Sequence, residues 1–102
     1  TGVGFTPKLV RLTASIGVSS TGANLGDGFM TSSAEMTRCI GVGSSVYNRY
    51  HNTSNCVSWI TGASSTTTPA LLASYVSMDA DGFTINVGTA NSTFDVVYEC
   101  YA

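Results

Sequence analysis

Charge is scarce in this sequence. Only 10% of its 102 residues are Asp, Glu, Lys or Arg, whereas soluble domains average about 25%. The formal net charge of -2 includes only four cations, too few to hold a phosphate backbone, so we expect no nucleic-acid partner. Ser, Thr, Asn and Gly must cover the surface instead. Because such a surface repels other copies only weakly and is easily desolvated, we expect a homo-oligomer.

Long apolar runs are also missing. No stretch of about 18 apolar residues is present to span a bilayer, so we expect no membrane partner. The first residues lack the basic and apolar regions of a secretion signal, and Thr1 is small enough to follow a removed initiator methionine. We therefore expect a complete chain made in the cytoplasm, with a processed precursor as the alternative.

Residues for catalysis are few. His51 is the only histidine, and no nucleophile-elbow pattern surrounds a serine. The three cysteines are an odd number without metal-binding spacing, so reduced and buried thiols are expected. A disulfide between Cys39 and Cys56 across a hairpin is the alternative. We therefore expect that the protein is not an enzyme and that it binds no cofactor.

Two short patterns resemble ligand-binding motifs. The segment Asp79-x-Asp81-Gly82 looks like the opening of a calcium loop, but the remaining ligand positions are absent, and we interpret it as a tight turn between strands. The pairs Gly2-x-Gly4, Gly26-x-Gly28 and Gly41-x-Gly43 precede no helix of a strand-turn-helix unit. They therefore do not indicate a phosphate-binding loop.

Apolar residues, by contrast, make up 43% of the chain and recur at every second position, which is the period of a strand with one buried face. The longest alternation runs from Val10 to Val18. We predict a single domain over residues 1–102, an antiparallel β-sandwich or jelly-roll-like fold of about seven or eight short strands. The segments that we read as strands are Lys8–Val18, Gly26–Thr31, Glu35–Val42, Cys56–Ile60, Tyr75–Met78, Phe83–Val87 and Phe94–Tyr101.

Two connections of this predicted fold bear on its topology. We expect the last three strands, from Ser74 to Ala102, to form an antiparallel meander. Residues Pro69–Ser74 fit either one helical turn or a strand.

Candidate contact residues lie in two segments without clear periodicity. Residues 1–6 form a possible N-terminal arm, and the polar loop Gly43–Asn55 carries two tyrosines, an arginine and the histidine. Aromatic and arginine side chains are typical of binding hot spots; the alternative is a hairpin loop whose tyrosines fold back onto the sheet. The only tryptophan either packs at the edge of the core or stacks on a sugar. The candidate partner-binding residues are Thr1, Val3, Phe5, Tyr47, Arg49, Tyr50, His51 and Trp59.

Several short segments, in order along most of the chain, carry a family resemblance. They are Phe5-x-Pro7-Lys8, Gly28–Ser33, Arg38–Val42, Cys56-Val57 and, most specific of all, Asp79–Asn86. On these segments the chain resembles a group of small structural proteins of tailed-bacteriophage and prophage virions, mostly of unassigned role. It departs from them at Val87, where they often carry an aromatic residue, and in its last strand, Tyr98–Ala102.

The resemblance implies a virion component with a β-sandwich or jelly-roll core and supplies no catalytic residues. We therefore expect a capsid decoration protein that binds the major capsid protein, or other virion subunits, as a symmetric oligomer such as a trimer. It would be located in the virion after synthesis in the host cytoplasm. The alternative is a tail-fibre or spike module that binds host surface glycans, with Trp59, Tyr47 and Tyr50 as stacking platforms.

Overall fold

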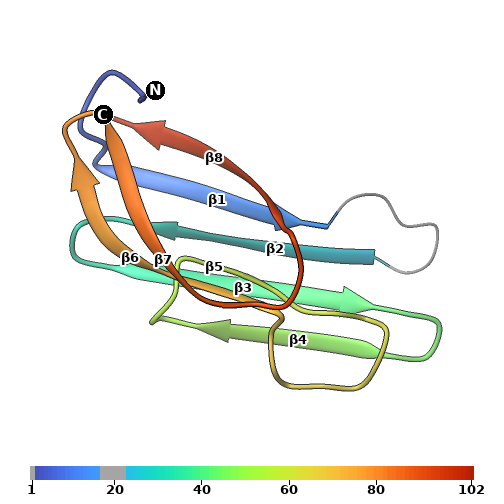
Figure 1. The fold of residues 1–102 in the computed structure, drawn as a ribbon. Coiled ribbons are helices and arrows are strands. Elements are labelled where there is room, and N and C mark those ends of the chain that lie inside the picture. Colours follow the sequence, from blue (N-terminus) through green and yellow to red (C-terminus); the bar gives the residue numbers. More distant parts are fainter. Residues whose placement is uncertain (1, 17–22) are drawn as a thin grey trace.

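Every regular element that the structure describes is a β-strand (Figure 1). The structure is a computed structural model that describes residues 2–16 and 23–102. Within these residues the strands form a five-stranded and a three-stranded sheet, and all neighbours are antiparallel. The predicted antiparallel β-sandwich is therefore confirmed. In chain order the strands are β1 (Leu9–Ser15), β2 (Ala23–Met30), β3 (Glu35–Val42), β4 (Tyr47–Asn52), β5 (Val57–Trp59), β6 (Leu71–Asp79), β7 (Gly82–Ala90) and β8 (Asp95–Tyr101).

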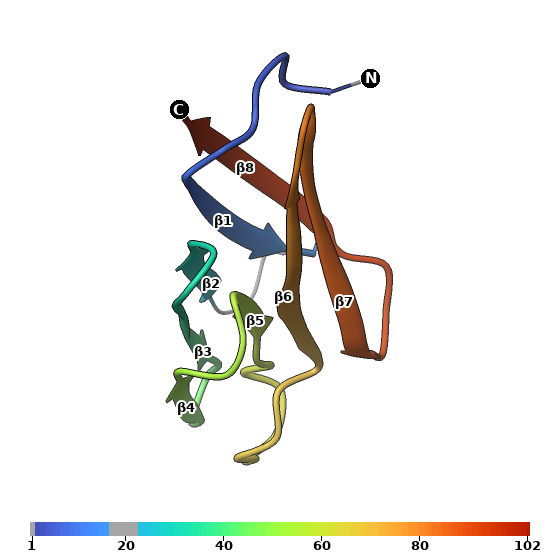
Figure 2. The ribbon, with the colours of Figure 1, turned by 90° about the vertical axis from the view of Figure 1, so that its left-hand side faces the viewer.

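The two sheets form two layers. The larger sheet has the strand order β4-β3-β2-β1-β8, and the smaller sheet, β5-β6-β7, covers one of its faces (Figure 2). Trp59 of β5 packs on Phe94, with ring centroids 5.5 Å apart, and helps to close the core. Both sheets contribute to this core, which consists of Val10, Leu12, Ala14, Met30, Cys56, Val57, Trp59, Leu71 and Ala73.

β1 follows the predicted alternation. Val10, Leu12 and Ala14 are fully buried or nearly so, while Arg11 and Thr13 between them are exposed. The strand begins and ends inside the predicted segment Lys8–Val18; the last two residues of that segment lie outside the described residues. The period of two identifies the buried face of this strand correctly.

Glycines of the larger sheet let β5 approach its backbone. A Cβ atom at Gly26 would meet the carbonyl oxygen of Ser58, and one at Gly28 would meet that of Cys56. On β3, a Cβ at Gly41 would lie 2.5 Å from the carbonyl oxygen of Ile60. β5 can therefore lie directly on this part of the larger sheet, and all three of its residues are buried. This is the structural role of the pair Gly26-x-Gly28 and of Gly41.

The C-terminal strands do not form the predicted meander. β6 and β7 make an antiparallel hairpin, but β8 crosses to the larger sheet and pairs with β1, from Leu9 opposite Tyr101 to Ser15 opposite Asp95. The prediction was wrong for β8 because alternation identifies a strand and its faces but contains no information about its partner.

The predicted polar loop Gly43–Asn55 is also corrected. Its central residues form β4, which pairs with β3 from Val42 opposite Tyr47 to Thr37 opposite Asn52. The alternation was hidden because neither face of this edge strand is apolar: Asn48 and Asn52 point inward, where Asn48 is buried. Asn48 donates from Nδ2 to the carbonyl oxygens of Thr61, at 2.5 Å, and Ser64, at 2.8 Å. These bonds fasten the loop after β5 to β4.

Two open alternatives are decided by the fold. The segment Pro69–Ser74 is not a helical turn, since β6 begins at Leu71. Cys39 and Cys56 are free and buried, and they do not share a hairpin, because Cys39 lies opposite Tyr50. Burial, followed by the nearby charge of Glu35, raises the pKa of Cys56 to about 12. Both thiols are core residues.

Candidate interaction surface

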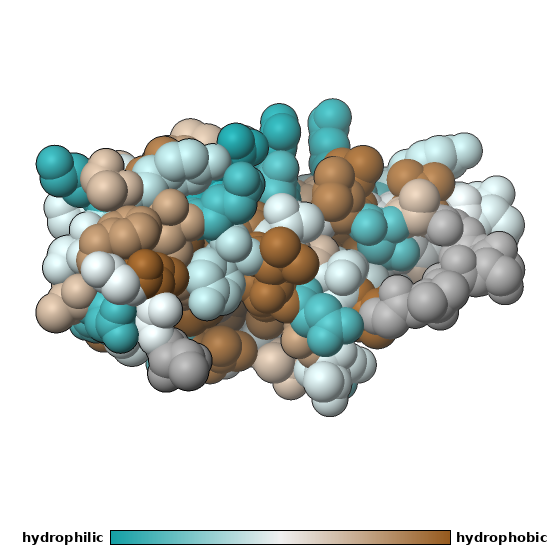
Figure 3. Space-filling model, turned by 90° about the horizontal axis from the view of Figure 1, so that it is seen from above, coloured by the Kyte–Doolittle hydropathy of each residue, from teal (hydrophilic) through white to brown (hydrophobic). Residues whose placement is uncertain are grey.

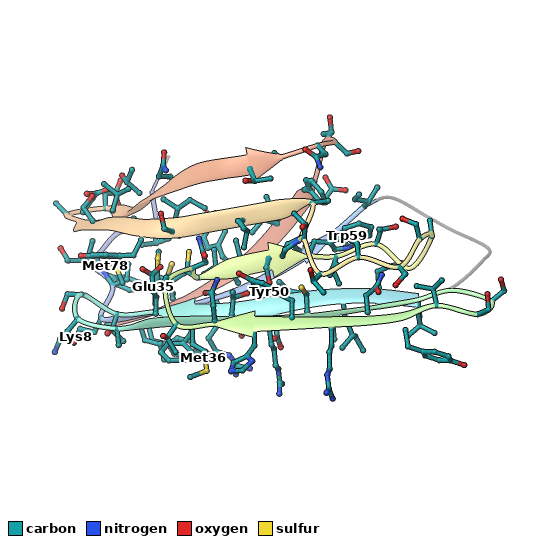
Figure 4. All side chains as sticks on the ribbon, turned by 90° about the horizontal axis from the view of Figure 1, so that it is seen from below. Lys8, Glu35, Met36, Tyr50, Trp59 and Met78 are labelled. Atoms are coloured by element: carbon teal, nitrogen blue, oxygen red, sulfur yellow. The ribbon has the colours of Figure 1, made fainter. Side chains whose placement is uncertain are left out.

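The larger sheet has one face that the smaller sheet does not cover. We call this face, made of the residues of its five strands that point away from the smaller sheet, the outer face. Figure 4 shows Met36 of β3 pointing away from the smaller sheet, while Glu35, Tyr50 and Trp59 lie between the layers. The exposed large apolar residues of the outer face are Leu25, Met36, Ile40, Tyr47, Val97 and Tyr101.

The burial of β3 is the reverse of what its hydrophobicity predicts. Its small and partly polar side, with Thr37 1% and Cys39 2% exposed, faces the core. Its apolar side, with Met36 43% and Ile40 49% exposed, faces outward. The close approach of β5 favours small residues beneath it, so the larger apolar side chains lie on the outer face. The sequence pattern indicated two faces here but not which one is buried.

A buried polar cluster accompanies this inversion. The Thr37 hydroxyl donates to the backbone oxygen of Asp27 at 2.8 Å and lies 2.8 Å from the Ser58 hydroxyl of β5. Burial raises the pKa of Cys39, and a hydrogen bond with Ser58 opposes the shift. Because these groups satisfy one another, the polar side of β3 can face the core without unpaired hydroxyls.

Charges on the outer face are unevenly distributed. Arg49 and His51 lie on β4 and Arg38 on the adjacent β3, whereas Asp95 and Glu99 lie on β8 at the opposite edge. The Arg38 Nε atom is 3.1 Å from Asp27 Oδ1, but with the Arg38 side chain 79% exposed this ion pair contributes little to stability. The face therefore has a cationic edge at β4, whereas at β8 the carboxylate Glu99 lies opposite Arg11 of β1.

A shallow depression of about 210 Å³ lies in the middle of the outer face. Phe29 and Met36, which are opposite each other on β2 and β3, form its apolar part. Arg11 and Arg38 border it. Aromatic, methionine and arginine side chains gathered in this way are typical of the centre of a protein interface.

The structure divides the predicted contact cluster of β4. Tyr47, Arg49 and His51 point to the outer face, and Tyr47 is 79% exposed. Tyr50 points inward and is half-buried, and its hydroxyl accepts a hydrogen bond from Asn52 Nδ2 at 2.8 Å. The first three residues are thus available to a partner, whereas Tyr50 belongs to the space between the sheets.

Trp59 is not available as a stacking platform. It is 9% exposed and belongs to the core, where it packs on Phe94. Its Nε1 atom is buried and has no acceptor among the described residues. Trp59 therefore packs in the core, as one of its two predicted alternatives stated, and its buried ring cannot stack on a sugar in this fold.

The N-terminal segment lies against the turn between β6 and β7. The Val3 amide donates to the backbone oxygen of Asp81 at 2.8 Å, and the Gly4 amide donates to Asp81 Oδ1 at 2.6 Å. Phe5 is half-buried, and Thr1 lies outside the described residues. The positive φ of 84° at Gly4 allows the backbone to make this turn. Residues 3 and 4 are therefore fastened to their own domain.

The Asp79–Gly82 segment forms the predicted tight turn. Asp79 accepts hydrogen bonds from the hydroxyls of Thr84 and Ser77, each at 2.7 Å, and these bonds lower its pKa, that of Thr84 having the larger effect. Within residues 2–16 and 23–102 no group of three or more His, Cys, Asp or Glu is placed to hold a metal ion. The aspartates thus serve the turn.

The side of the molecule seen in Figure 3 shows small apolar areas between polar ones. Figure 3, which looks onto the side where β8 lies, shows brown apolar patches separated by teal polar groups. In the part of the chain that the structure describes, no helix has the length and apolar character needed to cross a membrane.

Comparisons with protein-family models, curated proteins and solved structures find no match for this chain.

Proposed function

We propose that this protein is a structural component of a phage particle, a capsid decoration protein that binds the shell as a symmetric oligomer. Its role is non-covalent and includes no catalytic step or cofactor. The protein is made in the host cytoplasm and is then located in the virion. Two lines of evidence support the proposal: the β-sandwich fold agrees with what the sequence resemblance implies, and the outer face has the composition of an interface.

The inverted burial of β3 is the observation that carries this proposal. Met36 is 43% and Ile40 49% exposed, although the same strand buries Thr37. Scattered apolar residues on a surface are ordinary, but here they occur in neighbouring positions of one sheet, with Ile40 directly opposite Leu25 and Met36 opposite Phe29. The Arg38–Asp27 ion pair lies between these two apolar pairs. The outer face thus combines apolar and charged groups as protein interfaces do, and we expect a partner to cover it.

The dimensions of the outer face suit a protein partner. Five strands about 4.8 Å apart, with about seven residues each at about 3.3 Å, give a projected area of roughly 550 Å². Each partner of a standard interface buries about 800 Å² of accessible surface, a comparable size once side-chain relief is included. We expect the matching shell surface to be apolar, with acidic groups opposite Arg38, Arg49 and His51.

The proposal is tested by imaging intact particles at subunit resolution. Phage particles are assembled with the wild-type chain, with Ile40→Lys, and with Val76→Lys. Ile40 is 49% exposed on the outer face, and Val76 is 51% exposed on β6 of the other sheet, so both changes lose similar apolar area and add the same charge. We expect density for the protein on the shell with the wild type and with Val76→Lys, and at least tenfold lower occupancy with Ile40→Lys.

Other images would contradict the proposal. Density at the tip of a tail fibre or spike, together with binding on a glycan array, would favour the glycan-binding alternative. Unchanged shell occupancy of Ile40→Lys would exclude the outer face as the contact surface. Particles without this protein would reject a virion role.

A further inference from the structure

The four sheet edges of the described structure differ in how they are protected. A free edge presents unpaired N–H and C=O groups, and proteins usually block it with charge, proline or a short strand. β4 carries Arg49 and His51, and β8 carries Asp95 and Glu99. β5 has only three residues, all buried. β7 has nine residues, Gly82–Ala90, without a charged residue or a proline.

The outer edge of β7 is free in the described chain. β7 pairs with β6 from Gly82 to Ala90 on one side, with a bulge at Gly88, and the next strand, β8, belongs to the other sheet. Figure 2 shows β7 at the margin of the smaller sheet with no strand beyond it. Within the described residues its one irregularity is the bulge at Gly88, and no charged side chain, proline or further strand blocks the rest of this edge.

Apolar side chains accompany the free edge. Ile85 and Val87 lie opposite Tyr75 and Ala73 of β6, which belong to the core or pack against it, so this side of β7 faces the core. Val87 is nevertheless 52% exposed. An additional strand beside β7 would cover this valine.

We propose that a second copy of this chain adds its own β7 to this edge, in antiparallel orientation about a two-fold axis. The two smaller sheets then become one six-stranded sheet with the order β5-β6-β7-β7-β6-β5. In the register centred on Asn86, the β7 strands of the two copies lie side by side, and Ile85 of one copy lies opposite Val87 of the other.

Three observations favour a second copy over another strand. The edge is self-complementary, because the two-fold axis places its apolar residues opposite each other. It has no charge, so two identical edges do not repel each other. Apart from the two pairs that involve the bulged Gly88, seven antiparallel residue pairs form about 6–8 backbone hydrogen bonds, which is within the range of a typical protein interface.

This pairing specifies one interface of the symmetric oligomer in the proposed function. It rests on that proposal only for its role in a particle, because the association is a property of the free protein. The outer face lies on the other sheet and stays exposed in the dimer. Dimerisation and shell binding can therefore fail separately.

The first test is the oligomeric state of the purified full chain. Sedimentation equilibrium is measured for the wild type, Val87→Lys and Val76→Lys. The two valines are 52% and 51% exposed, but only Val87 lies on β7. We expect a dimer for the wild type and Val76→Lys, and at least a tenfold weaker dimer for Val87→Lys. A monomeric wild type, or equal association of both variants, would overturn the proposal; a monomer would leave the edge to a strand from a different protein.

A second test is independent of the charged variant. In the proposed register the two Asn86 residues face each other with Cα atoms about 4.5–5.5 Å apart, within the range of a disulfide. Asn86→Cys should therefore give a covalent dimer under mild oxidation. Asn91→Cys, at another exposed asparagine just beyond β7, and the wild type with its native cysteines should not. Failure of Asn86→Cys to cross-link would reject this pairing even if Val87→Lys did not fold.

Discussion

Gly26, Gly28 and Gly41 show how the absence of a side chain determines the distance between the two layers. Each lies where a Cβ atom would overlap a carbonyl oxygen of the segment around β5. These contacts involve backbone on both sides, so neither side can move aside as a flexible side chain would. These three glycines are important for the fold because the backbone around β5 occupies the space that a Cβ atom would need.

Gly26→Ala is therefore expected to destabilise the fold. Its new methyl group would meet the backbone of Ser58, and we expect the free energy of unfolding in urea to fall by about 2–4 kcal/mol. Gly88→Ala is the matched control, because a Cβ there has only Leu72 O near it, at 4.0 Å. It should change stability by less than about 1 kcal/mol. Similar losses in both variants would contradict the close packing of β5.

The buried thiol of Cys56 makes stability depend on pH in the alkaline range. Its pKa is about 12 in the folded protein and 9.0 ordinarily, so above pH 9 the unfolded chain loses this proton first. The contribution of Cys56 to stability is complete below pH 9 and is lost as the pH rises toward 12. Urea unfolding from pH 8 to 11 should thus show a shallower decline for Cys56→Ala than for the wild type. Parallel curves would show that this thiol ionises equally in both states.

At the scale of strands, the sequence predicted where each strand lies along the chain better than it predicted which strands pair. The bounds of β3 were predicted correctly from its alternation, and β1, β5 and β7 lie within one to three residues of prediction at each described end. β8 was recognised as a strand but assigned to the wrong sheet. Alternation depends on local contacts with the core, whereas the pairing of Leu9 with Tyr101 depends on contacts between distant segments.

The candidate site was only partly predictable for the same reason. Tyr47, Arg49 and His51 were selected by residue type and do lie on the outer face. Leu25 and Ile40 were missed, because the sequence gives the two sides of a strand but not the side that the second sheet covers. The Gly-x-Gly pairs were the available signal: glycines in a strand indicate close approach of another backbone.

Glu35 connects the two sheets at an irregular point of β6. Its Oε1 atom accepts a hydrogen bond from the Tyr75 amide at 2.9 Å, beside a shift in the β6–β7 register. Glu35→Ala leaves this half-buried amide unpaired and should lower the free energy of unfolding by about 1–3 kcal/mol. Glu35→Gln keeps a side-chain oxygen and should lose less than half as much, as measured by urea unfolding. Equal losses would indicate that the charge matters rather than the hydrogen bond.

At the scale of the whole molecule, the two proposed contact surfaces belong to different sheets. The outer face is on the larger sheet, and the β7 edge is on the smaller one. A dimer joined at β7 would therefore present two outer faces to a repeating scaffold. Such a bivalent unit binds a lattice more tightly than one copy without any new kind of contact.

The salt dependence of association should distinguish pairing of two copies through β7 from pairing of β4 with β8. The β7 edge has no charged residue, whereas the β4 and β8 edges carry opposite charges. Since salt screens charge pairs but not backbone hydrogen bonds, dimerisation through β7 should change less than threefold between about 0.02 and 0.5 M NaCl. Sedimentation equilibrium at both concentrations measures this. A dimer that dissociates in high salt would indicate pairing of β4 with β8.

The pairing of β1 with β8 also determines when the larger sheet can be completed. Among the described strands β1 is synthesised first and β8 last, so the second edge of β1 stays unpaired until Tyr101 has been made. Until then the emerging chain exposes an unprotected strand edge while its other elements are already assembling. Contacts this distant in sequence slow folding, and we expect the final closure of the sheet to follow the synthesis of β8.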